Sequence, residues 1–159
     1  CGECVQLCPT GALTEKKAVG KGRSWETIKI RTTCPYCGVG CQMHLHVKDN
    51  EIIRVTGVED AEPNYGALCV KGRFGYDFVH SSERLKTPLI RKNGKLEEVS
   101  WEEALDYTSA RLSEIKQAHG PDSIVGIGCA RSVNESNYVM MKFMRAVIGT
   151  NNVDHCART

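Results

Sequence analysis

The sequence predicts a mixed α+β fold with two different halves. Up to about residue 86, short β-branched or alternating segments flank cysteine-rich loops, which indicates small antiparallel strands around those loops. From residue 87 onward, two helical patterns enclose a short apolar segment, which indicates an α-β-α order. The change of pattern predicts a subdomain boundary near residue 86.

The first half contains three predicted strands. Residues 1–13 form a loop-rich unit in which Pro9 and Gly11 stop any helix, and the basic, polar residues 14–26 are expected to be a solvated linker or a docking surface for an acidic partner. Residues 27–33 alternate as a strand does, and residues 42–48 and 51–56 flank a turn dipeptide and predict a hairpin. A short helix is expected around residues 73–79.

The second half begins with another hairpin. Residues 88–92 and 95–99 flank Asn93-Gly94, a strong turn signal. Ser100 and Glu103 have the spacing of a capping box, and Gly120 ends the helix that follows. One face of this helix is apolar or small and is expected to be buried: Trp101, Ala104, Leu105, Thr108, Leu112 and Ile115.

The last segments are a buried strand at residues 123–128 and a second helix. Ser132 and Glu135 have capping-box spacing at the start of this helix, which is expected to run to about Ile148 before Gly149.

Composition excludes several classes of protein. The formal net charge of +2 is too small to indicate a nucleic-acid-binding surface. No apolar run approaches the roughly 18 residues of a membrane-spanning helix, and no secretion signal opens the chain. The 9 cysteines are an odd number in close C-x2-C and C-x3-C spacings, which favours metal binding over disulfides and a reducing, cytoplasmic setting.

The central cysteines predict a [4Fe–4S] cluster. Cys34, Cys37 and Cys41 lie in one short loop with Gly38 and Gly40, and the fourth thiolate, Cys69, comes after the predicted hairpin returns the chain. Structural zinc is the alternative, but its usual signature is two C-x2–4-C pairs rather than a triplet and a distant cysteine.

The amino-terminal cysteines match the end of a bacterial ferredoxin motif, C-x2-C-x2-C-x3-C-P. Cys1, Cys4 and Cys8 followed by Pro9 fit its last three cysteines. In two-cluster ferredoxins the final cysteine serves the other cluster, so Cys1 and Cys4 are expected to share one cluster and Cys8 to serve a second. Neither ligand set is complete within these residues.

The remaining cysteines and histidines carry weaker signals. Cys129 and Cys156 stand alone in the sequence and are expected to be small buried side chains rather than ligands. His44 and His46 alternate on a predicted strand and are expected on an exposed face, and His80 and His119 in surface turns.

Residues 27–159 resemble the amino-terminal cluster region of molybdopterin-dependent formate dehydrogenases. The resemblance rests on TTCPYCGVGCQMHLHVKDNEI, GALCVKGRFGYDFVHSSERLKTPLIR, VSWEEALDY and ARSVNESNYVMMKFMRAVIGTNNVDHCAR. It implies a tail of a ferredoxin-type domain (1–13), a linker (14–26), a β-rich [4Fe–4S] domain (27–86) and the start of an α/β molybdopterin-binding domain (87–159).

The resemblance also implies cofactors and roles for single residues. Cys34, Cys37, Cys41 and Cys69 match the family's cluster ligands, and Lys71 matches a lysine that relays electrons between cluster and pterin. The family uses two molybdopterin guanine dinucleotides on Mo or W, oxidises formate to carbon dioxide and passes two electrons outward. Candidate pterin contacts lie in a loop-to-helix segment, where α/β folds place ligand-binding groups, although capping is an equal alternative: Arg131, Asn134, Glu135 and Asn137.

In that family, the stretch matching residues 152–158 leads directly to the metal ligand, selenocysteine or cysteine, and then to a catalytic histidine. His155 is not that histidine. We therefore expect no catalytic residue up to Thr159, and no formate oxidation by the 159-residue chain alone. The codon after Thr159 is expected to be UGA, read as selenocysteine and followed by a histidine codon; UAA or UAG without a homologous continuation would contradict this.

Three other functions remain open from the sequence. Molybdenum nitrate reductases and the large iron–sulfur subunit of NADH dehydrogenases share the cluster pattern. A ferredoxin-like electron carrier would need no α-β-α segment, and a zinc-stabilised interaction module would differ in metal content. Electrons are expected to leave through the ferredoxin-type unit to another subunit, a ferredoxin or an NAD(P)-dependent flavoprotein.

Overall fold

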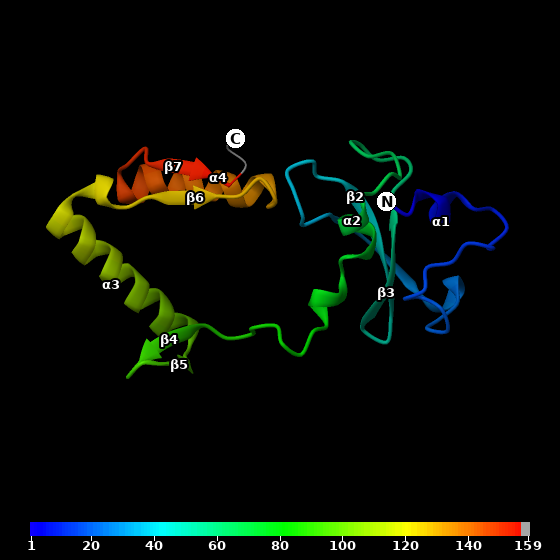
Figure 1. The fold of residues 1–159 in the computed structure, drawn as a ribbon, viewed down its shortest axis with the longest axis horizontal. Helices are drawn as coiled ribbons and strands as arrows, with labels where there is room; N and C mark the ends of the chain where they lie inside the picture. The colour runs from blue at the N-terminus through cyan, green and yellow to red at the C-terminus, as the bar shows by residue number, and fades with distance from the viewer. Residues whose placement is uncertain (157–159) are drawn as a thin grey trace. The chain divides into compact units, whose positions relative to one another are not determined.

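The computed structural model describes residues 1–156 and divides the chain into two compact units (Figure 1). The first unit contains Cys1–Ser82 together with Arg131–Asn134, and the second contains Glu83–Ala130 and the residues from Glu135 onward.

The first unit is built on a three-stranded antiparallel sheet. Its strands are β1 (Ile28–Thr33), β2 (Gln42–Lys48) and β3 (Glu51–Gly57), in the order β1-β2-β3. Asp49 and Asn50 form the β2–β3 turn with φ of 50° and 63°, the left-handed values that a tight two-residue hairpin requires. The predicted strands and hairpin are therefore confirmed.

The core of this unit lies on the face of the sheet that contacts α2 (Val70–Phe74). Alternate residues of β3 are buried, as expected for a strand with one packed face, and Val55 is only 1% exposed. Met43, Leu68, Tyr76 and the thiol of Cys34 complete the buried cluster. A cysteine of the central motif is thus part of the hydrophobic core.

Helical segments in this unit differ from the prediction. The segment 1–13 contains a short helix, α1 (Glu3–Leu7), which ends before Pro9. The single helix predicted at 73–79 is wrong: α2 begins directly after Cys69 and ends at Gly75, and a separate 3₁₀ turn, η2 (Asp77–Val79), follows. Gly75 ends α2 because its N–H bonds to the Lys71 carbonyl while its backbone leaves the helical region.

Most of the basic segment 14–26 is exposed, as a solvated linker would be, but Glu15 and Lys17 attach it to the first unit. Glu15 is buried and accepts a hydrogen bond of 2.8 Å from the Tyr76 hydroxyl, which also donates to the Ile53 carbonyl at 3.0 Å. Lys17 donates to the Phe74 carbonyl at 2.9 Å and pairs with Asp77. Burial raises the pKa of Glu15, because the charged carboxylate loses solvation there. A 3₁₀ turn, η1 (Ser24–Glu26), ends the segment.

His46 is buried rather than on an exposed face, so that prediction is wrong. Its exposure is 2%, and its Nε2 lies 2.9 Å from the Thr56 hydroxyl on the neighbouring strand. Burial, with Arg54 nearby, lowers the pKa of His46 to about 4. Met43 and His46 lie three residues apart on β2, so a regular strand places them on opposite faces, and both positions are buried.

Acidification is expected to destabilise the first unit through His46. Its pKa is lower in the folded state, so the stabilisation is complete above the unfolded value of 6.5 and is lost as pH falls toward 4. The loss between pH 7 and 4 is on the order of 3 kcal/mol. Denaturant titrations across this range check it, with His46→Leu as the control that should lack this step; an equal pH dependence in both proteins would contradict the assignment.

The second unit contains two helices, a hairpin and a short parallel pair of strands. β4 (Leu89–Lys92) and β5 (Lys95–Glu98) form the predicted hairpin, with φ of 50° at Asn93 and 83° at Gly94. α3 (Trp101–His119) ends at Gly120, and Ser100 caps it by accepting from the Glu103 N–H at 3.1 Å. Glu103 itself pairs with Lys92, so the structure confirms the capping serine of the predicted box.

The chain then passes through a 3₁₀ turn, η3 (Pro121–Ser123), into β6 (Gly126–Gly128). α4 (Asn134–Phe143) continues into a π-helical turn, η4 (Met144–Ile148), which ends at Gly149 as predicted. β7 (Val153–His155) pairs with β6 in parallel. The capping box predicted at Ser132 and Glu135 stays a prediction.

Two predicted buried surfaces of this unit are exposed. α3 has no buried residue, and on its apolar face Trp101 and Leu105 are 68% and 63% exposed. The strand predicted at 123–128 is shorter than expected, and Val125 and Ile127 are exposed. The apolar patterns are those of covered elements, but the described part of the chain packs little against them. None of its helices is long and apolar enough to span a membrane.

Candidate iron–sulfur centre

The loop that contains three of the central cysteines is closed by the β1–β2 pairing. Thr33 pairs with Gln42, and the Cys34 N–H donates to the Cys41 carbonyl at 2.8 Å, so the two end cysteines lie at the base of the loop. Gly40 has a φ of 74°, which a β-carbon would strain. The sequence folds locally into a short loop that brings Cys34, Cys37 and Cys41 to one end of the sheet.

Cys69 reaches the same region from the other side of the core. It immediately precedes α2, and its carbonyl accepts from the Arg73 N–H at 3.1 Å. Gly72 of α2 is buried, and a β-carbon at this position would lie 3.4 Å from the Cys34 sulfur. The helix that follows the fourth cysteine therefore packs directly on the first.

The four central thiols influence one another electrostatically. Burial is the main cause that raises the pKa of Cys34 and of Cys41. The nearby thiols add to it, those of Cys37 and Cys69 acting on both residues. A site of this kind holds thiolates when positive metal ions compensate their charge.

Two hydrogen-bonding residues that sequence reasoning missed hold the loop in place. Asn64 accepts from the Gln42 N–H at 2.7 Å and donates to the carbonyls of Gln42 and Ala67, at 3.0 and 2.9 Å. Tyr36 donates its hydroxyl to the Gly75 carbonyl at the end of α2. In the sequence, both residues are marked only as polar residues near the cysteines, and many other residues share that property.

Among the residues predicted to contact a pterin, Asn134 lies against the cysteine loop. Its amide donates to the Gly38 carbonyl at 2.7 Å. Lys71 is exposed on α2, two residues after Cys69, and Arg131 belongs to the same compact unit. Glu135 belongs to the second unit, where it lines a cavity of about 530 Å³ with Val139, Met140 and Phe143. The structure thus brings Asn134 into hydrogen-bonding contact with the cysteine loop.

The amino-terminal cysteines lie around α1, which Arg73 anchors to the central unit. Arg73 is 2% exposed, pairs with Glu3, and donates to Gln6 Oε1 at 2.6 Å and to the Cys1 carbonyl at 3.3 Å. The Thr10 hydroxyl and neighbouring backbone N–H groups lower the pKa of Cys8 to about 7. Nothing in the sequence pattern marks Arg73 as a buried anchor.

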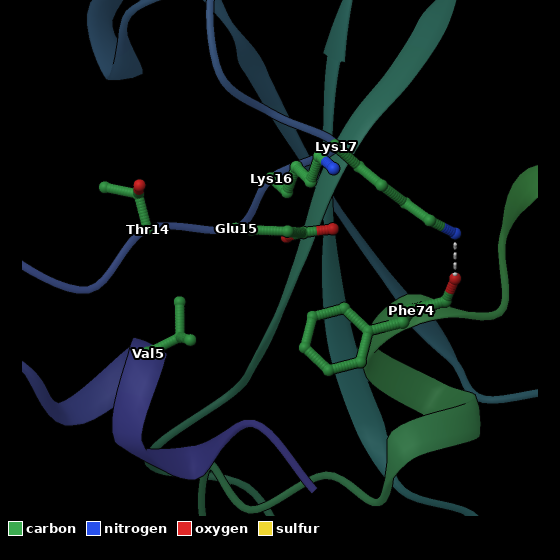
Figure 2. Close-up of a pocket in the computed structure, with 6 residues that line it drawn as sticks. All are labelled: Val5, Thr14, Glu15, Lys16, Lys17 and Phe74. Carbon is green, nitrogen blue, oxygen red and sulfur yellow. Dashed lines mark hydrogen bonds between the residues drawn. The ribbon is translucent and has the colours of Figure 1, made fainter.

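A mainly apolar cavity of about 520 Å³ lies between α1, the segment around Glu15 and the end of α2. Figure 2 shows the residues that line it. Val5 and Phe74 form its apolar side, and the chain of Lys17 crosses to the Phe74 carbonyl.

Cys129 and Cys156 are neither isolated nor buried, which contradicts the prediction. Their sulfurs lie 3.3 Å apart, Cys129 is half-buried and Cys156 is exposed. Asn137, predicted as a ligand-binding residue, instead brackets the backbone of Cys129: it accepts from the N–H at 3.2 Å and donates to the carbonyl at 3.0 Å.

The chemistry of the central donor set fits an iron–sulfur cluster. Four thiols from one loop and one helix start are the ligand type that [4Fe–4S] clusters use, and the glycines at 38, 40 and 72 keep side chains out of this region. Within residues 1–156, no group of three His, Cys, Asp or Glu side chains has the geometry to hold a single metal ion.

Comparison with known proteins supplies the family. The family model described as "Molybdopterin oxidoreductase Fe4S4 domain" matches residues 28–81, and the one described as "Molybdopterin oxidoreductase" matches residues 84–159. Together these assign the protein a [4Fe–4S] cluster and, in its full-length form, a molybdopterin cofactor.

Two relatives illustrate the similarity. Formate dehydrogenase H of Escherichia coli (strain K12) is 52% identical over 137 residues, which cover 82% of this chain and 19% of that protein. A Bacillus subtilis (strain 168) protein named "Putative formate dehydrogenase YrhE" is 48% identical over 136 residues, which cover 86% of this chain and 14% of that protein. The chain thus spans about a fifth or less of the length of these relatives, and it belongs to the molybdopterin oxidoreductase family.

Proposed function

We propose that Cys34, Cys37, Cys41 and Cys69 bind the [4Fe–4S] cluster of this family. The observation that supports this is their placement: three thiols on a loop closed by β1–β2 pairing and a fourth at the start of α2, with Gly72 against the Cys34 sulfur. The same cysteines fall inside the segment matched by the Fe4S4 family model.

We also propose that the whole protein oxidises formate to carbon dioxide. Both relatives described above carry the name formate dehydrogenase, and together they match most of this chain. The pterin-bound Mo or W would supply the two-electron chemistry when bound. Within this chain, the buried Cys34 and the packing of α2 fix one side of the cluster site, which favours one-electron relay through a cluster held in place.

Lys71 is proposed to tune the potential of that relay and to assist electron transfer from the pterin to the cluster, while Arg131, Asn134 and Glu135 are proposed pterin contacts. Asn134 has a further role visible in the geometry, because its bond to the Gly38 carbonyl connects the start of α4 to the cysteine loop. A pterin that contacts Asn134 would therefore contact a residue that is hydrogen-bonded to the cysteine loop.

Lys71→Met is expected to lower the midpoint potential of the central cluster, because a nearby cation stabilises the reduced, more negative form. A unit charge about 7 Å away at an effective dielectric of about 20 contributes roughly 2.4 kcal/mol, or on the order of 100 mV, and the exposure of Lys71 to solvent reduces this figure. Lys71→Arg should keep the potential, and Lys95→Met on β5 serves as the control. A potential unchanged in Lys71→Met would reject the tuning role.

The remaining parts of the proposal concern the protein beyond this chain. The ligand of the metal is proposed to be selenocysteine, and the setting a reducing cytoplasm, which the dense thiol content favours. Cys1, Cys4 and Cys8 are proposed ligands of ferredoxin-type clusters. These would pass electrons to another subunit, a ferredoxin or an NAD(P)-dependent flavoprotein.

The test is anaerobic addition of formate to the full-length protein, followed by electron paramagnetic resonance. Formate is expected to reduce the cluster and produce its signal, and Cys69→Ala should abolish that signal. If formate does not reduce the cluster, while NADH reduces it or nitrate oxidises its reduced form, formate is not the substrate. Iron content separates the two proposals: a protein that holds the cluster but ignores formate keeps the cluster assignment and loses the activity.

A further inference from the structure

Cys129 and Cys156 follow directly on the two strands of the parallel pair. Gly128 pairs with His155, so the cysteines occupy the next position of the same register. Neighbouring strands lie about 4.8 Å apart, which falls within the range of Cα separations that disulfides join. The two thiols are thus set side by side by the backbone of β6 and β7, although 27 residues separate them in the sequence.

One of the two cysteines is held rigidly. The side-chain amide of Asn137, on α4, bonds both the N–H and the carbonyl of Cys129. A β-carbon on the preceding Gly128 would lie 3.0 Å from Asn137 Oδ1, so only a glycine fits there comfortably. Cys129 is therefore held in place beside Cys156, whichever bond the Cys156 sulfur forms.

The other cysteine is accessible. Cys156 is exposed and Cys129 is half-buried, and both are present as thiols. The sulfurs are 3.3 Å apart, and a disulfide needs about 2.05 Å, a difference that small rotations about the side-chain bonds can supply. An exposed thiol beside a fixed second thiol is the arrangement of a reactive and a resolving cysteine.

We propose that Cys129 and Cys156 are a reversible dithiol–disulfide site that low-molecular-weight disulfides such as oxidised glutathione oxidise. The Cys156 thiolate attacks the small disulfide, forming a mixed disulfide and releasing one small thiol. The Cys129 thiolate then attacks the Cys156 sulfur, forms the Cys129–Cys156 bond and releases the second small thiol. Two protein thiols are oxidised, one small disulfide is reduced, and the protons pass to the two released thiols.

The bond would join β6 to β7 just beyond the three residue pairs that connect them. Closing a loop between Cys129 and Cys156 restricts the unfolded chain, so the oxidised form should unfold at a higher temperature than the reduced form. The site is distinct from the cluster cysteines, none of which lies in the second unit.

The experiment equilibrates the anaerobically purified, cluster-loaded protein with a series of reduced and oxidised glutathione mixtures. Remaining thiols are then alkylated, and tryptic peptides are analysed by mass spectrometry. Cys129 and Cys156 fall in separate tryptic peptides, 117–131 and 146–158, each with no other cysteine. A linked pair of these peptides, lighter by two hydrogens than their sum and removed by dithiothreitol, is expected to increase as the mixture becomes more oxidising.

Two variants and one condition control this result. Cys129→Ser and Cys156→Ser should each abolish the linked pair while keeping the far-ultraviolet circular dichroism of the wild type. In guanidinium chloride the linked pair should become much less abundant at the same glutathione ratio, because the strands no longer hold the thiols together. A folded protein whose two peptides stay alkylated, or carry only glutathione, across the whole series overturns the proposal.

Discussion

Replacing Cys34 by serine is expected to abolish the iron–sulfur cluster and also to destabilise the protein without it. A hydroxyl is a poor ligand for iron, so the protein should lose the iron of the central cluster and the signal of that cluster in its reduced form. Cys34 is 5% exposed in a cluster with Met43, Val55, Leu68 and Tyr76, and burial of an unsatisfied hydroxyl there costs roughly 1–3 kcal/mol.

A matched variant separates the two effects. Cys69 is exposed at the start of α2, so Cys69→Ser should lose the cluster equally while leaving the free energy of unfolding of the metal-free protein nearly unchanged. Cys129→Ser, in the second unit, should keep the cluster. Iron and sulfide analysis together with denaturant unfolding of the metal-free proteins check these outcomes. Full iron content in Cys34→Ser or Cys69→Ser would show that the ligand set is wrong.

The local elements of this chain are largely predictable from sequence because local chemistry determines them. The turns at Asp49-Asn50 and Asn93-Gly94 adopt the left-handed values that these residues tolerate best, and both predicted hairpins form around them. Ser100 and Gly120 likewise mark the ends of α3. Each of these signals acts over a few residues and needs no distant partner.

Predictions that depended on distant contacts fared worse. His46 is buried and lies against Thr56 on the neighbouring strand, and alternation along β2 does not show which of its faces is covered. Glu15 is polar in a basic segment, yet it is buried because Tyr76, far along the chain, supplies a hydrogen bond. Cys129 and Cys156 look isolated in the sequence, and only the parallel pairing of β6 with β7 brings them together.

The same distinction applies to the candidate site. Spacing alone singles out the four central cysteines, because ligands of one cluster must come from a short loop and one returning segment. The residues that position them, Asn64 and Tyr36, act through backbone carbonyls and amides whose location requires the folded chain. Supporting hydrogen bonds of this kind leave no spacing rule in the sequence.

Arg73→Ala is expected to release α1 and its cysteines from the central unit. Arg73 is buried and donates to Glu3, Gln6 and the Cys1 carbonyl, so its removal takes one donor from each of three acceptors. Breaking such a buried pair costs about 3–5 kcal/mol, and the partial exposure of Glu3 places the expected loss at or below the lower end of that range. Arg73→Lys should recover only part, since an ammonium cannot reach all three acceptors in the planar geometry of guanidinium.

The measurement is hydrogen exchange and limited proteolysis of residues 1–8 combined with denaturant unfolding. The exposed Arg31, replaced by alanine, is the matched control and should change the free energy of unfolding by no more than about 0.5 kcal/mol.

The stability of the wild type should also depend on pH through Glu3. The Leu68 N–H and Arg73 lower the pKa of Glu3, so in the wild type its contribution is present above 4.5 and is lost as pH falls through that lowered value. In Arg73→Ala the remaining contribution should be smaller and should disappear at a higher pH, because Arg73 no longer favours the carboxylate and the Leu68 N–H and the chain amino terminus remain. Equal protection of residues 1–8 in Arg73→Ala and the wild type would show that Gln6, which accepts from the Gly57 N–H and donates to the Gly66 carbonyl, is sufficient to hold α1.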